Sequence, residues 1–239
     1  LTACGETPTE QADLAAPLAQ QALDGDYSDH TVVLGYAEII TDPLSGEAGR
    51  TVFFRKDLGN GELSHHFVYN DPRRSWNTAP GLSYAIKEDN TSSDVNLEDQ
   101  VFWLEESIDR WDAQRCSDIP LTRNASTAGE PGLVEFFFNT GILTLAFTEA
   151  DLTQVGLLSG TEFPYFAANP NVLGVAFSLF WTDAAGNVTD IDQDGRSDVA
   201  IREIYYNDDF EWSDNGVGGE RGSGIFDFPT VAIHEAGHG

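Results

Sequence analysis

The feature of this sequence that most limits its fold is one run of apolar residues with the spacing of an α-helix, which lies between stretches typical of β-strands. Five apolar residues recur at spacings of four, three, four and three, as expected for one face of an α-helix. These residues are Leu97, Val101, Leu104, Ile108 and Trp111. Asn96 precedes them as a helix cap, with Asp99 three places further on. The pattern predicts an amphipathic helix over 96–115 whose apolar face packs against another layer.

The stretches on both sides of this helix are rich in β-branched and aromatic residues, and Gly, Pro and Asp punctuate them. The predicted strands are 31–36, 51–56, 65–70 and 82–86 before the helix, and 133–138, 142–147, 172–181 and 199–206 after it. Strands, a long helix, more strands and a terminal helix predict an α+β fold, with an α/β-like mixed, twisted sheet against helices.

The 239 residues are enough for one large domain or two small ones. Residues 1–30 are rich in Ala, Gln, Thr, Pro and Asp without periodicity, which is typical of a flexible tether. We expect residues 31–78 to form a small β-rich segment that precedes the main domain. Residues 79–239 contain the long helix and the terminal helix and are expected to be that domain.

A net charge of −28 excludes nucleic-acid binding through a basic patch, because a phosphate backbone would be repelled. A hydrophobic share of 41% is too high for an acidic disordered chain, so a buried core is expected. The apolar stretch 172–181 has about half the length needed to cross a bilayer, so no transmembrane segment is predicted.

The first residues, Leu1-Thr2-Ala3-Cys4, resemble a bacterial lipobox. In that interpretation Cys4 carries a lipid anchor, and the protein is extracytoplasmic, either secreted or tethered at a bacterial cell surface. The alternative is an ordinary chain terminus. With Cys4 lipidated, Cys116 has no disulfide partner in this chain, so no disulfide framework is predicted.

The last nine residues, VAIHEAGHG, contain an HExxH motif made of His234, Glu235 and His238. Positions four apart lie on one face of a helix, so both imidazoles can bind one zinc ion while Glu235 faces a water molecule at the metal. A chain of this composition contains such a motif by chance with a probability of roughly 0.7%, so chance is a poor explanation. Asp227 is placed to cap this helix and Pro229 fits its first turn.

The stretch 227–239, DFPTVAIHEAGHG, resembles the active-site helix of metzincin zinc peptidases, specifically the matrixin-like branch, whose pattern is HExxHxxGxxH followed by a Met-turn. The resemblance implies a zincin-like fold, with His234 and His238 as zinc ligands and a third His beyond residue 239. It also implies that 199–206 is the edge strand with which an extended peptide substrate pairs. Because the pattern is cut, we expect weak zinc binding and no useful catalysis from residues 1–239 alone.

The sequence DIDQDGRSD places Asp190, Asp192 and Asp194 at alternate positions, with Gly195 at a sharp turn and Asp198 at the ninth position. This spacing is typical of a calcium loop, in which carboxylates converge on one hard cation. The match to an EF-hand is incomplete because the twelfth position is Ile and not Glu. The alternative interpretation is a solvated acidic turn.

These features predict a zinc-dependent endopeptidase, with Glu235 as the general base and Ca2+ as a structural ion. Its partner is a peptide or protein substrate in extended conformation. A gluzincin, whose third ligand is a downstream Glu, is an alternative within the same class of enzymes. An alternative from another class is a calcium-stabilised extracellular binding module with a non-functional HExxH.

Overall fold

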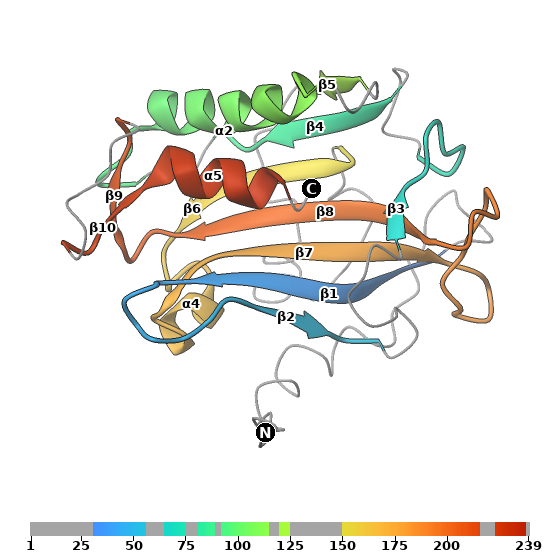
Figure 1. The fold of residues 1–239 in the computed structure, drawn as a ribbon, viewed down its shortest axis with the longest axis horizontal. Helices are drawn as coiled ribbons and strands as arrows, with labels where there is room; N and C mark the ends of the chain where they lie inside the picture. Colours follow the sequence, from blue (N-terminus) through green and yellow to red (C-terminus); the bar gives the residue numbers. More distant parts are fainter. Residues whose placement is uncertain are drawn as a thin grey trace.

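The computed structural model describes residues 31–55, 65–74, 81–88, 92–114, 120–124, 150–215 and 223–237. In these ranges one mixed sheet of eight strands lies against helices, which confirms the predicted α+β class (Figure 1). The strands of this sheet are β1 (Thr31–Thr41), β2 (Arg50–Phe53), β3 (His65–Phe67), β4 (Leu82–Ile86), β5 (Leu121–Arg123), β6 (Leu152–Leu158), β7 (Val172–Thr182) and β8 (Ser197–Asn207). The helices are α2 (Leu97–Asp112), α4 (Pro164–Ala168) and α5 (Phe228–Ala236), and β9 (Glu211–Ser213) and β10 (Ile225–Asp227) form a separate parallel pair.

The main sheet has the order β2-β1-β7-β8-β6-β4-β5, and β3 pairs with the first residues of β8. The adjacent strands β8, β6, β4 and β5 run parallel to one another. On the other side of β8 the pairing is antiparallel, between β8 and β7, between β7 and β1, and between β1 and β2. Among the described residues the sheet therefore has four parallel strand pairs, β3–β8 included, and three antiparallel ones.

Strands from residues 31–78 belong to this same sheet. β1 pairs with β7 from Thr31 opposite Thr182 to Thr41 opposite Val172, and β2 extends the sheet beyond β1. The β-rich segment expected at 31–78 is therefore not separate from the main sheet. Residue 78 is not a boundary between two sheets. The physical reason is that β1 buries side chains on both faces of the sheet, including those of Val32, Tyr36 and Ala37, as an interior strand does.

The prediction that 199–206 is an edge strand is wrong. These residues lie in β8, between β7 and β6, and all but the first residue of β8 are buried. Nearly continuous apolar sequence is typical of a strand covered on both faces, and this signal favoured an interior position. The outer strand on the antiparallel side is β2.

The long helix is confirmed as α2. The Asn96 side chain accepts a hydrogen bond from the backbone N–H of Asp99 at 3.0 Å, and Leu104 and Ile108 are buried on the face predicted to be apolar. The helix ends at Asp112, three residues before the predicted end.

Each face of the sheet carries its own apolar core. Helices α2 and α5 cover one face, where Leu104 and Phe228 pack with Ile204 of β8 (Figure 1). The opposite face packs around Phe163, Phe166 and α4. Because β8 contributes Ile204 to one core and Tyr205 to the other, it is the central strand of the structure.

The strand β6 was absent from the predictions because its sequence, LTQVGLL, interrupts apolar residues with Gln154 and Gly156. Gly156 has a φ of +92°, and a side chain there would meet Gln100 of α2 at 2.6 Å. The predicted strands 133–138 and 142–147 and the tether 1–30 lie outside the described residues. Neither length nor apolar character qualifies any helix in the described ranges to cross a bilayer.

Candidate functional site

The helix that carries the HExxH motif begins where the sequence predicts. The Asp227 carboxylate accepts a hydrogen bond from the backbone N–H of Thr230 at 3.0 Å, and Pro229 lies in the first turn. Regular helix extends to Ala236, and Gly237 keeps helical dihedral angles of −72° and −16°. The two described residues of the motif differ in environment, since His234 is exposed and Glu235 is 1% exposed.

Apolar residues fix α5 against the sheet and against α2. Phe228, Val231 and Ala232 pack into the core below the two helices. At the far end of α5, the Trp111 indole of α2 donates a hydrogen bond to the carbonyl oxygen of Ile233 at 2.8 Å. The core packing of α5 and its hydrogen bond with Trp111 therefore hold His234 and Glu235 in position over the sheet.

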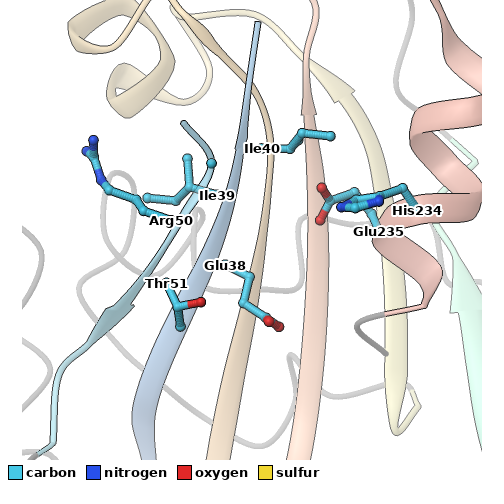
Figure 2. Close-up of a pocket in the computed structure, with 8 residues that line it drawn as sticks. Glu38, Ile39, Ile40, Arg50, Thr51, His234 and Glu235 are labelled. Carbon is cyan, nitrogen blue, oxygen red and sulfur yellow. The ribbon is translucent and has the colours of Figure 1, made fainter. Parts of the chain in front are cut away.

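His234 and Glu235 line a pocket with a volume of about 390 Å³ (Figure 2). The other described lining residues come from β1, β2 and the residue before β2, and they are Glu38, Ile39, Ile40, Gly49, Arg50 and Thr51. Figure 2 shows the side chains of His234 and Glu235 projecting from α5 toward these strands. One wall of the pocket is thus built by residues 38–51, which the sequence did not connect with the HExxH motif.

Small residues of β7 lie between these two walls. Gly174 and Ala176 are paired with Ile40 and Glu38 of β1. A side chain at residue 174 would approach the Ile40 Cγ2 atom at 3.3 Å. Small residues at these two positions leave space between α5 and β1 that larger side chains would fill.

Tyr206 lies close to Glu235 in the buried part of the site. Burial raises the pKa of Tyr206 well above its usual value, and the negative charge of Glu235 raises it further. The hydroxyl donates a hydrogen bond to Gln154 Oε1 at 2.9 Å. Tyr206 therefore stays protonated at neutral pH.

A second polar cluster lies next to the pocket and centres on Arg202, which is 7% exposed. Its guanidinium donates to the Tyr36 hydroxyl at 2.9 Å and lies 4.0 Å from Glu38. The Tyr36 hydroxyl also forms a hydrogen bond of 2.7 Å with His65 Nε2. Burial, and next the charge of Arg202, lower the pKa of His65 to about 4, so its imidazole is neutral at pH 7.

Sequence reasoning missed this cluster because its members come from β1, β3 and β8, with no local motif to connect them. A charged Arg inside the apolar run of 199–206 was the one available signal, because a buried cation needs polar partners.

The acidic loop has part of the predicted geometry. Gly195 has a φ of +87°, which confirms the predicted sharp turn, and the Asp190 carboxylate accepts from the backbone N–H groups of Asp194 and Gly195 at 3.1 and 2.9 Å. Asp192 and Asp194 lie 3.6 and 3.5 Å from His66 Nε2.

Asp198 differs from the other three carboxylates because it is completely buried. It forms an ion pair with Arg73 at 2.7 Å, and Arg73 also binds Asp71 at 2.6 Å. No motif in the sequence connects a cation of residues 65–74 with this loop.

Three predicted residues, His238, Cys4 and Cys116, lie outside the described residues. The structure therefore places one predicted zinc ligand, the predicted general base and all four predicted calcium ligands. Comparison with protein-family models found no matching family, and comparisons with curated proteins and with solved structures found no match.

Proposed function

We propose that this protein is a zinc-dependent endopeptidase and that Glu235 is its general base. The observation that carries the proposal is that His234 and Glu235, adjacent on α5, line one pocket while the rest of the helix is fixed in the core. The sequence resemblance to the metzincins, in their matrixin-like branch, supports the same assignment and a zincin-like fold.

The residues of α5 fit a zinc ion by their chemistry. The exposed His234 imidazole lies at the pocket, and the helical dihedral angles of Gly237 are compatible with a helix that continues toward His238. His234 and His238 would hold the ion together with a third ligand, a His in a metzincin or a Glu in a gluzincin. When bound, zinc supplies Lewis-acid polarisation and makes water more acidic at neutral pH.

Glu235 would perform the proton transfers of the reaction. As the water oxygen bonds to the peptide carbonyl carbon, the Glu235 carboxylate accepts the proton that the water loses. It then gives this proton to the peptide nitrogen as the carbon–nitrogen bond breaks, and a carboxylic acid and an amine are released. Its 1% exposure keeps competing solvent away from the carboxylate, and the neighbouring Tyr206 remains neutral.

The substrate is a peptide in extended conformation, and β2 is the strand beside the pocket that can pair with it. Arg50 and Thr51 of β2 line the pocket, and among the described residues β2 is the outermost strand on the antiparallel side of the sheet. An extended peptide would bind there through backbone hydrogen bonds, as in other cases of strand addition. This assignment replaces 199–206 as the pairing strand.

The proposal is tested with Glu235→Gln in protein expressed from its complete reading frame. We expect the variant to lose at least about a hundredfold in cleavage of an unstructured protein substrate, because general base catalysis contributes 10²–10⁴-fold. Zinc content, measured by mass spectrometry of the metal, should be unchanged. In His234→Ala both zinc and activity should fall.

Glu211→Gln is the matched control, because Glu211 is an exposed Glu of β9. Full activity in Glu235→Gln would refute the role of Glu235. A wild-type protein without zinc and without hydrolysis would favour the alternative, a calcium-stabilised extracellular binding module.

Lipid anchoring at Cys4, with location at a bacterial cell surface, is part of the same proposal and has its own test. Radiolabelled palmitate should label the wild-type protein but not Cys4→Ser. Labelling of both would show that Cys4 is not the anchor.

A further inference from the structure

We propose that Asp190, Asp192 and Asp198 form a calcium site that closes the β7–β8 connection onto the start of β8. One carboxylate oxygen from each of these three residues lies within 4.8 Å of the others. The site is at the end of the sheet where β3 meets β8 (Figure 1). The proposal concerns a structural ion and does not depend on the peptidase assignment.

Asp198 provides the observation that separates this group from an ordinary acidic turn. Its side chain is completely buried, and its Oδ2 atom accepts hydrogen bonds from Arg73 at 2.7 Å, Thr189 at 2.7 Å and the backbone N–H of Ile191 at 3.0 Å. Its Oδ1 atom is also buried but has no hydrogen-bond partner among the described residues. A buried carboxylate oxygen without a partner is costly, and a cation beside Asp190 and Asp192 would satisfy it.

The local charge balance also favours a cation. Arg73 is the guanidinium that contacts Asp198, and it also contacts Asp71. One positive charge therefore faces the negative charges of Asp71, Asp198, Asp190 and Asp192. A divalent ion would offset most of the remaining repulsion.

The donor atoms favour calcium over a transition metal. All three side chains offer carboxylate oxygen, and two of them, Asp190 and Asp192, are on an exposed loop that can adjust to the large, variable shell of Ca2+. Gly195, with its φ of +87°, allows the loop to turn back toward Asp198. Backbone carbonyl groups and water can complete such a shell.

A second group in the same loop is the rival. His66, Asp192 and Asp194 also bring ligand atoms within 4.8 Å of one another, and a mixed set of nitrogen and oxygen donors suits zinc or manganese. In the part of the chain that the structure describes, His66 Nε2 is buried and has no hydrogen-bond partner, but this group lacks a fully buried carboxylate. The proposed ligand set therefore contains Asp198 and excludes His66, and it no longer contains Asp194.

The test uses the full chain, freed of metal with a chelator and then titrated separately with CaCl2, MgCl2 and ZnCl2. Calorimetry gives the affinity and thermal unfolding gives the change in Tm. We expect CaCl2 to raise the Tm of the wild-type protein, and we expect Asp192→Asn to bind calcium at least tenfold more weakly. Asp192 is exposed, so the variant should fold, and far-UV circular dichroism without calcium checks this.

Asp209→Asn is the matched control for the loss of one exposed negative charge, and His66→Gln separates the two ligand sets. Both variants should keep the calcium response of the wild-type protein. The proposal is overturned if millimolar CaCl2 leaves the Tm of the wild-type protein unchanged. It is also overturned if Asp192→Asn responds like the wild type, or if ZnCl2 alone gives a response that His66→Gln removes.

Discussion

Trp111 and Ile233 join the two helices that cover one face of the sheet, through a hydrogen bond of 2.8 Å from the indole nitrogen to the backbone carbonyl oxygen. The same indole lies against Gly237, where a Cβ atom would be 2.5 Å from Trp111 Cζ2. Gly237 stands between Glu235 and His238 in the motif. The absence of a side chain at this position thus allows α2 to approach the end of α5.

Gly237→Ala should destabilise the protein by about 1 kcal/mol, because the indole must move and lose its hydrogen bond to Ile233. In a Trp111→Ala background the same change should be neutral or stabilising, since alanine is the better helix former. The measurement is a double-mutant cycle of urea unfolding, with a coupling energy of at least about 0.5 kcal/mol expected. Additive effects would mean that the indole does not restrict residue 237.

Arg73→Gln should lower the free energy of unfolding by about 3–5 kcal/mol, because Asp71 and Asp198 would remain buried without their cation. Arg110→Gln is the control, because Arg110 pairs with Glu106 on the exposed surface of α2. Its loss should cost less than about 1 kcal/mol. Urea unfolding measures both losses of free energy. Equal losses in the two variants would contradict a stabilising role of the buried ion pairs of Arg73.

The His65 imidazole should make stability depend on pH. Its pKa is about 4 in the folded protein, against an ordinary value of 6.5, so between these values the unfolded chain binds more protons. The stability that depends on neutral His65 is complete above pH 6.5 and is lost as the pH falls toward 4.

His65→Gln removes this component, so its unfolding free energy should fall less steeply than that of the wild type over this interval. Above pH 7 the two curves should run parallel. Chemical unfolding at a series of pH values checks this, and curves that stay parallel down to pH 4 would show that His65 is not the group responsible.

Asp227→Ala should lower stability by about 1 kcal/mol, because the first turn of α5 loses its side-chain cap. Asp227→Ser should recover most of this loss, because serine also caps helices well. Thermal unfolding measures the stability, and the cleavage assay shows whether the cap also affects Glu235. An alanine variant as stable as the serine variant would mean that the cap contributes nothing.

The two helices at the site could be predicted because their information is local. A period of apolar residues and the cap at Asn96 define α2, and Asp227 with Pro229 defines the start of α5. Strand pairing depends on distant residues, so the sequence did not reveal that β1 pairs with β7. For the same reason HExxH identified His234 and Glu235, whereas the opposite wall of the pocket, from Glu38 to Thr51, required the structure.

The pairing of β1 with β7 also has a consequence for the order of events during synthesis. Thr41 cannot meet its partner Val172 until the long intervening chain has left the ribosome. At about 5–20 residues per second this takes on the order of ten seconds. During this time β1 has β2 as its native neighbour on one edge, but its other edge waits for β7, and contacts this distant in sequence also form slowly. Until translation has passed β7, one edge of residues 31–41 is therefore open to pairing with other chains.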